Sequence, residues 1–201
     1  MTSPIDFWFS IGSPYTYLSV MRIDRFEDLH GITFRWRPFS VRAIMIEMDN
    51  IPSRKPAKLA YMWRDIERRA AGSLCDFPRR PPYPLQNFDL ANRIAVVGAA
   101  EGWCEDYVRA TYARWFGLCE EAGCEPNVSA SLKEVGQDPA RVLALAQSDE
   151  TGRAYAAATA EAKSLGIFGA PTFVTGGEIF WGDDRLEDAV RWHGKGTLVR
   201  R

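Results

Sequence analysis

The hydrophobic pattern at the start of the chain predicts two strands with a helix between them. Residues 5–10 form a short, aromatic-rich apolar run, and residues 32–37 alternate between apolar and polar side chains, as strands do. The apolar positions between Tyr15 and Leu29 repeat instead with the spacing of one helix face. A unit of this order predicts parallel strands joined by a right-handed crossover.

The middle of the chain has helical patterns. Residues 41–50 fit a short helix better than a strand, and residues 56–72 carry an apolar stripe that ends at Gly72. The proline-rich residues 77–84 cannot form a regular helix and predict an extended loop. Further helices are predicted over residues 87–100, 104–123, 138–145 and 151–165.

Strand patterns return near the C-terminus. Residues 172–174 and 178–181 flank a pair of glycines, which predicts a hairpin with a Gly-Gly turn. A closing helix over residues 185–192 follows, and Asp183 or Asp184 is expected to cap it.

Together these patterns predict an α/β domain that is interrupted in sequence. Residues 1–40 and 166–201 are expected to form the α/β part, and residues 41–165 an all-helical insertion. With 201 residues and 46% hydrophobic content, the chain is long enough to bury one sizeable core.

Charge and composition exclude several classes of function. The net charge of −1 provides no field that would recruit nucleic acid or an anionic membrane surface. No run approaches the ~18 apolar residues that span a membrane, and the first residues do not resemble a signal peptide, so a cytoplasmic protein is expected. His30 and His193 are the two histidines, which argues against a histidine-based metal site, and no metal ligand is assigned.

The four cysteines contain no C-x-x-C pair. They are Cys75, Cys104, Cys119 and Cys124. They could form two disulfides, but in a reducing compartment they are expected to act as small buried hydrophobic residues.

Three motifs carry a resemblance to a known family. They are DF at 6–7 with SPYTYL at 13–18, GIFGAPTF at 166–173 and GEIFWGDDRL at 177–186. In this order they resemble the motifs of the 2-hydroxychromene-2-carboxylate isomerases, relatives of the kappa-class glutathione transferases and of DsbA-like thioredoxin-fold proteins. The resemblance implies an α/β, thioredoxin-like fold of the DsbA and kappa type with a large all-helical insertion.

The resemblance also implies an activity. It implies glutathione as cofactor, a homodimer, and a small aromatic-derived substrate whose cis double bond becomes trans through thiolate addition and elimination. Two alternatives stay open: a kappa-class-like glutathione transferase, which releases a conjugate, and a non-catalytic thiol-binding module.

Ser13 is the central candidate residue. Ser13-Pro14 has the residues typical of a helix N-cap and first position, at a place where redox relatives carry a nucleophilic cysteine. A serine hydroxyl is a poor nucleophile without a base, but it can donate a hydrogen bond to the thiolate of bound glutathione. The alternative is that Ser13 only caps its own helix.

The C-terminal motifs imply a glutathione-binding edge. Ala170-Pro171 is implied to be a cis peptide bond that faces the Ser13 loop, with the Ala170 backbone pairing the cysteinyl part of glutathione. Trp181, Gly182, Asp183 and Asp184 are implied to hold the γ-glutamyl end. The family usually has an amide residue where this chain has Asp183, so the extra negative charge is expected to weaken glutathione binding.

Three further residues are implied to contact the substrate. Asn50 lies in a loop that reaches the substrate in the family, and Lys58 lies on one face of the helix over residues 56–72. Asn87 follows the proline-rich loop and precedes Arg93 by six residues, as the substrate-binding Asn of the isomerases does. Each has a simpler alternative, because Lys58 fits a solvated helix face and Asn87 fits a plain N-cap.

Overall fold

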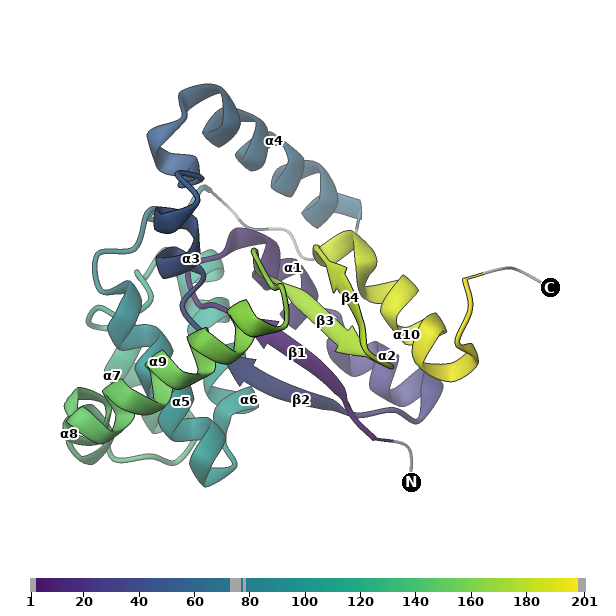
Figure 1. Ribbon diagram of the computed structural model, residues 1–201. Helices are drawn as coiled ribbons and strands as arrows, with labels where there is room; N and C mark the ends of the chain where they lie inside the picture. Colours follow the sequence, from purple (N-terminus) through teal and green to yellow (C-terminus); the bar gives the residue numbers. More distant parts are fainter. Residues whose placement is uncertain (1–2, 73–76, 78, 199–201) are drawn as a thin grey trace.

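The structure is a computed structural model that describes residues 3–72, 77 and 79–198 (Figure 1). In this part of the chain, a mixed sheet has the strand order β2-β1-β3-β4, in which β1 and β2 are parallel and β3 runs antiparallel to both β1 and β4. The strands are β1 Ile5–Phe9, β2 Phe34–Pro38, β3 Thr172–Thr175 and β4 Glu178–Trp181. The predicted strand–helix–strand unit and the C-terminal hairpin are therefore confirmed.

The sheet is built on β1, which lies between β2 and β3. Phe7 is fully buried and faces Trp36 on one neighbouring strand and Phe173 on the other. The Phe7 and Phe173 rings stack with their centroids 5.2 Å apart, and Trp36 meets Phe7 edge-on at 4.9 Å. Such aromatic pairs add to the stabilisation that burial of their apolar area provides.

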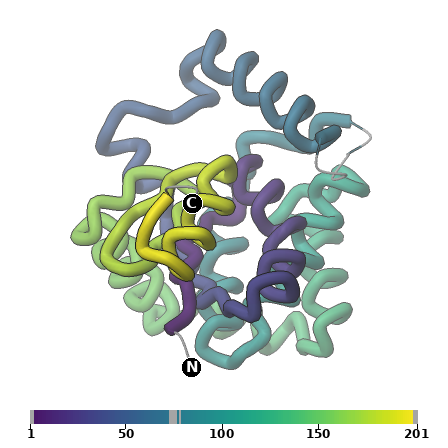
Figure 2. The backbone as a smooth tube through the Cα atoms, turned by 90° about the vertical axis from the view of Figure 1, so that its right-hand side faces the viewer, coloured from purple at the N-terminus to yellow at the C-terminus, as the bar shows by residue number. Residues whose placement is uncertain are grey.

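Helices cover the sheet and extend away from it (Figures 1 and 2). In both views α4 lies across the top of the molecule. The first helices are α1 Pro14–Val20, α2 Ile23–His30, α3 Val41–Glu47, the 3-10 turn η1 Pro52–Arg54 and α4 Pro56–Gly72. The later ones are α5 Phe88–Glu101, α6 Cys104–Tyr112, the π-helical η2 Ala113–Leu118, α7 Asn127–Glu134, α8 Pro139–Gln147, α9 Asp149–Ser164, the 3-10 turn η3 Asp183–Arg185 and α10 Leu186–Lys195.

The single helix predicted between Tyr15 and Leu29 is wrong, because the chain breaks between α1 and α2. Arg22 leaves the helical conformation with φ −122° and ψ −16°. Its guanidinium binds Asp183, a residue 161 positions later in the chain. The hydrophobic period continues through this break and does not record such a distant ion pair.

Two other expectations about helices are wrong. The helix predicted over 104–123 ends earlier, because Cys119 adopts a left-handed conformation, and α7 was not predicted. Neither Asp183 nor Asp184 caps the closing helix, since Arg185 occupies that position without a side-chain cap bond. The carboxylate of Asp183 is bound by arginines instead.

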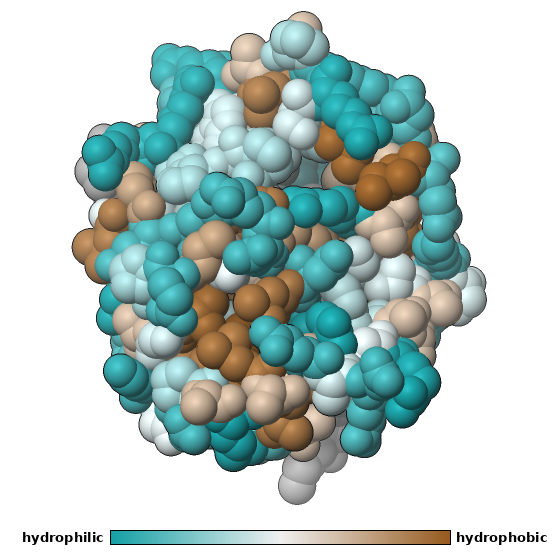
Figure 3. Space-filling view, turned by 90° about the vertical axis from the view of Figure 1, so that its left-hand side faces the viewer, coloured by the Kyte–Doolittle hydropathy of each residue, from teal (hydrophilic) through white to brown (hydrophobic). Residues whose placement is uncertain are grey.

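Buried residues from both ends and from the helical middle form one continuous core. The division into a split α/β domain and an insertion stays a prediction. Figure 3 shows the face on the left of Figure 1, where hydrophilic residues predominate and apolar residues gather in a few groups. Among the described residues, no helix has the length and apolar character that crossing a membrane requires.

Candidate functional site

Ser13 lies where β1 leads into α1, and its hydroxyl makes contacts on both sides. It accepts a long hydrogen bond from the Thr16 N–H at 3.4 Å, as an N-cap does, and it donates to the Ala170 carbonyl at 2.8 Å. Ala170-Pro171 is a cis peptide bond, as the resemblance implied. The Ser13 hydroxyl and the cis-proline loop therefore face each other directly.

Two buried side chains hold the loop that carries Ser13. Asn92 on α5 accepts from the Ile11 N–H at 2.7 Å and donates to the Ile11 carbonyl at 2.8 Å. The hydroxyl of Tyr112 lies 3.1 Å from the carbonyl oxygens of both Ser10 and Ser13. Neither residue was predicted from the sequence. The available signal for Asn92 was a polar residue on the otherwise apolar face of α5.

Position 12 of this loop requires a glycine. Its φ is +116°, and a Cβ at this position would lie 2.6 Å from the ring of Phe88. The loop before Ser13 is therefore pressed against the start of α5.

We expect Asn92→Ala to lower the free energy of unfolding by about 2 kcal/mol or more, because it leaves the buried polar groups of Ile11 without partners. Denaturant unfolding measures this change. Gln147→Ala, at an exposed position at the end of α8, is the matched control and should change stability by less than about 0.5 kcal/mol. Equal stability of the two variants would contradict this role of Asn92.

A cavity of about 590 Å³ opens beside Ser13. The sequence-predicted site residues that line it are Ser13, Asn50, Lys58, Ala170, Trp181, Gly182, Asp183 and Asp184. Its apolar wall includes Met45, Met48, Met62, Tyr83 and Phe168. Residues from both ends of the chain and from α3 and α4 thus meet at one cavity.

Two predicted residues lie outside this lining. Pro171 is buried and does not line the cavity. Asn87 stands at the N-cap position of α5 without a side-chain cap bond, and its amide lies 3.4 Å from Cys124 Sγ. The structure does not bring the Asn87 side chain to the cavity.

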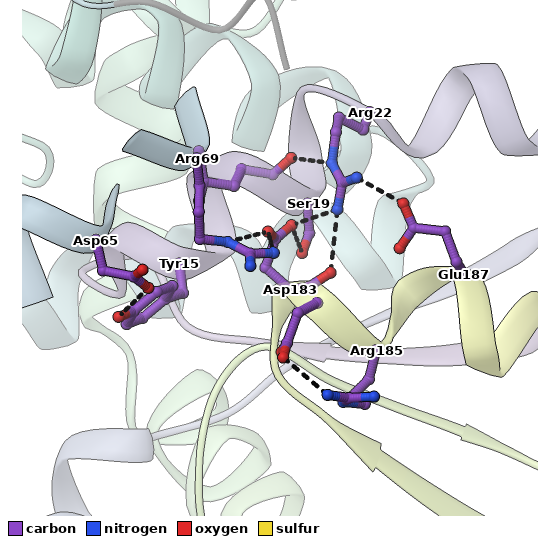
Figure 4. Close-up of polar contacts among 10 residues, drawn as sticks. Tyr15, Ser19, Arg22, Asp65, Arg69, Asp183, Arg185 and Glu187 are labelled. Atoms are coloured by element: carbon purple, nitrogen blue, oxygen red, sulfur yellow. Dashed lines mark hydrogen bonds and ion pairs between the residues drawn. The ribbon is translucent and has the colours of Figure 1, made fainter. Parts of the chain in front are cut away.

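The side of the cavity formed by α4 is polar. Lys58 Nζ donates to the side-chain oxygen of Asn50, so the two predicted substrate contacts are paired. Tyr15, two positions after Ser13 in the chain, donates to Asp65 at 2.9 Å (Figure 4). Burial, followed by the hydrogen bond to Asp65, raises the pKa of Tyr15 well above its usual value, so Tyr15 is a neutral donor here.

Asp183 is the most buried charged residue of the cavity lining, and Figure 4 shows its polar contacts. Its side chain is 2% exposed and accepts from Arg22 at 2.7 Å and from Arg69 at 2.5 Å, while the Ser19 hydroxyl donates to it at 3.2 Å. These partners come from the α1–α2 junction and from α4, so one carboxylate ties three segments together. The negative charge at Asp183, where the family usually has an amide, is thus compensated by two guanidinium groups.

Asp184 has a different environment. Its side chain is 50% exposed and lies 3.1 Å from Arg185. The preceding Gly182 has φ +112°, and a Cβ there would lie 2.5 Å from the Asp184 carboxylate. The Gly182 N–H donates to the Pro171 carbonyl at 2.9 Å, which fixes this turn to the cis-proline loop.

The described cysteines lie away from this cavity. Cys104 is buried, and burial raises the pKa of its thiol; Cys119 and Cys124 are half-buried free thiols. None of these three lines the cavity, and Cys75 lies outside the described residues.

The fold, with a cis-proline loop that faces the start of a helix, is typical of thioredoxin-like proteins. Comparison with known families gives the same class. Residues 4–191 match the model of the DSBA-like thioredoxin domain, and the chain belongs to this family.

Within the family, the chain is similar to proteins named 2-hydroxychromene-2-carboxylate isomerase. The protein of that name from Sphingobium xenophagum is 27% identical over 190 residues, which cover 93% of this chain and 96% of the relative. A solved structure of 2-hydroxychromene-2-carboxylate isomerase superposes with a TM-score of 0.84 at 24% identity, covering 96% of this chain and 95% of the other. Glutathione S-transferase kappa 1 from Caenorhabditis elegans is 36% identical over 80 residues, which cover 39% of this chain and 34% of that protein. The similarity to named isomerases supports an enzyme.

Proposed function

We propose that this protein is a glutathione-dependent cis-trans isomerase of the 2-hydroxychromene-2-carboxylate isomerase type, acting in the cytoplasm as a homodimer. The observation that carries the proposal is the Ser13 hydroxyl, which donates to the Ala170 carbonyl at 2.8 Å beside a cavity of about 590 Å³. A hydroxyl donor and a backbone edge at this place suit the thiol and the peptide of glutathione.

In the proposed complex the Ser13 proton changes partner. It turns from the Ala170 carbonyl to the sulfur of glutathione, where it favours the thiolate, because a hydrogen bond to the charged form lowers a pKa. The Ala170 carbonyl then accepts the cysteinyl N–H of the peptide. In the protein without glutathione, the hydrogen bond between Ser13 and Ala170 holds the hydroxyl and the carbonyl beside the proposed position of the thiol.

The reaction needs no redox partner. In the ring-opened form of the substrate, the thiolate adds to one carbon of the double bond, and the electron pair moves onto the oxygen of the ketone that is conjugated with that bond. The former double bond is now single and rotates. When the carbonyl re-forms, the thiolate leaves and the trans double bond is restored, so that glutathione is regenerated.

The substrate acid is proposed to lie against the α3 and α4 side of the cavity. Asn50 and Lys58 supply an amide and a cation there, joined to each other by a hydrogen bond. Asn87 remains a proposed substrate contact whose side chain would have to turn away from Cys124 to reach the cavity.

Asp184 is proposed to bind the γ-glutamyl ammonium group, because the carboxylate of Asp183 is already bound by Arg22 and Arg69. We expect Asp184→Asn to weaken glutathione binding about 10-fold or more, since a hydrogen bond to a charged group contributes ~1.5–3 kcal/mol. Calorimetric titration of glutathione measures this affinity.

The matched control for Asp184→Asn is Glu178→Gln, which removes one negative charge from β4, the preceding strand, at a position outside the cavity lining. Its glutathione affinity should equal that of the wild type. An Asp184→Asn variant that binds glutathione as tightly as the control would refute the assignment of the ammonium to Asp184.

Turnover of 2-hydroxychromene-2-carboxylate, followed by absorbance with and without glutathione, tests the proposed reaction. We expect conversion to the trans acid only with glutathione present, and no glutathione conjugate in the mass spectrum of the product. The local similarity to the kappa transferase favours one alternative, a transferase, which accumulation of a conjugate would identify. Glutathione binding without turnover of either kind would indicate a thiol-binding module.

A further inference from the structure

Arg42, on α3, is a half-buried cation without an acidic partner. Its guanidinium donates to the Leu85 carbonyl at 2.9 Å and lies over the ring of Phe88, 4.0 Å from the centroid. Among the described residues it forms no ion pair, whereas Arg69, which lines the cavity beside Ser13, pairs with Asp183. A cation that is taken out of water without a carboxylate partner is costly, so this one is available to a ligand anion.

Burial lowers the pKa of Arg42 below its usual value, and the negative charge of Asp89 offsets only part of this effect. The guanidinium still carries its charge at neutral pH, because an arginine side chain is not deprotonated in proteins. Asp89 lies on the exposed side of α5, outside the cavity that Arg42 lines.

Arg42 faces a side cavity of about 240 Å³. The lining includes a second cation, Arg54, and no Asp or Glu among the described residues, while most of the remaining wall is apolar or aromatic. The side cavity shares part of its lining with the larger one, namely Gly12, Val41, Met45, Pro52 and Tyr83. It therefore adjoins the larger cavity beside the loop that carries Ser13.

The side cavity lies on the side of Ser13 away from the proposed glutathione edge. None of the residues 168–184 lines it, whereas Phe168, Ala170 and Trp181 to Asp184 all line the larger cavity. A peptide that runs from Ser13 toward Asp184 leaves the Arg42 side open. The positive charge of Arg42 therefore lies where the substrate, and not glutathione, would bind.

We propose that Arg42 binds the carboxylate of the substrate acid, with the conjugated chain extending along Met45 and Tyr83 toward Ser13. This inference rests on the proposed function and assigns the residue that holds the carboxylate of its substrate. Arg42 offers the planar donor geometry that carboxylates favour, and Phe88 keeps the guanidinium in place beneath it. The glycine carboxylate of glutathione has the same chemistry and is the competing source of the anion.

Binding of cinnamate and cinnamamide, measured by calorimetry without glutathione, tests this inference. The two probes share ring and double bond and differ in the charge of the acid group. The wild type should bind cinnamate about 10-fold more tightly than cinnamamide or better, since hydrogen bonds between charged groups are the stronger ones. Arg42→Gln should remove this preference by weakening cinnamate binding alone.

Two further variants control for structure and for general charge. Arg42→Lys keeps the cation and should keep a preference for cinnamate. Arg25→Gln removes an exposed arginine from α2 and should bind both probes as the wild type does.

An undiminished preference for cinnamate in Arg42→Gln would overturn the proposal. The absence of any preference in the wild type would overturn it as well, and this measurement does not depend on the folding of a variant. A loss of glutathione affinity in Arg42→Gln with unchanged cinnamate binding would overturn it too, because the anion would then be the glycine carboxylate. Since cinnamate is measured without glutathione, failure of the isomerase proposal would not mimic any of these results.

Discussion

Ser13→Ala is expected to slow isomerisation about 100-fold at saturating glutathione, because removal of one hydrogen-bond donor that stabilises a developing anion typically has an effect of this size. The hydroxyl that is lost is the one that now donates to the Ala170 carbonyl. Loss of its N-cap bond should lower the free energy of unfolding by only about 1 kcal/mol. Steady-state kinetics and denaturant unfolding of the same variant separate the two effects.

The control for this substitution is Ser164→Ala, which removes an exposed hydroxyl that donates to the Glu161 carbonyl at the end of α9. It should leave the rate unchanged. A Ser13→Ala enzyme with the wild-type rate would show that Ser13 is a helix cap and has no part in the reaction.

Asp183→Asn is expected to destabilise the fold by about 3–5 kcal/mol, the usual cost of leaving a buried ion pair with one charge unpaired. The Asp183 side chain is 2% exposed between Arg22 and Arg69, and an amide would leave Arg69 without its ion-pair partner, while Arg22 would keep Glu187. From the sequence, an amide at this position was expected to favour glutathione binding. In the structure the carboxylate of Asp183 pairs with two arginines, so the substitution is expected to act first on stability.

Denaturant unfolding of Asp183→Asn measures this cost, and Asp184→Asn is the control because its carboxylate is half-exposed. The control should lose less than about 0.5 kcal/mol. If Asp183→Asn does not fold, Arg69→Gln combined with Asp183→Asn should recover part of the stability, because fewer buried charges are left unpaired. An Asp183→Asn protein as stable as the control would contradict the role of Asp183 as the shared partner of two arginines.

The strands could be predicted from the sequence because their signals are local. The aromatic run of β1 and the Gly-Gly turn between β3 and β4 each lie within a few residues. The order of motifs at the two ends of the chain also led to the correct family, and eight of the residues predicted for the site line the cavity.

What the sequence did not predict depends on contacts between distant residues. The break after α1 accompanies the pairing of Arg22 with Asp183, and the support of the Ser13 loop depends on Asn92, 81 positions from Ile11. No local period encodes either contact. From the neighbouring sequence, Asp183 was expected to cap a helix. In the structure it is the centre of an ion-pair cluster with Arg22 and Arg69, which are distant from it in the sequence.

The pKa of the glutathione thiol in the bound state tests the central claim most directly. Thiolate absorbance is followed against pH for glutathione bound to the wild type and to Ser13→Ala. If Ser13 stabilises the thiolate, the bound thiol titrates below the ~8.5 of a free thiol in the wild type, and its pKa rises toward that value in the variant. Identical titration curves for the two proteins would contradict the account.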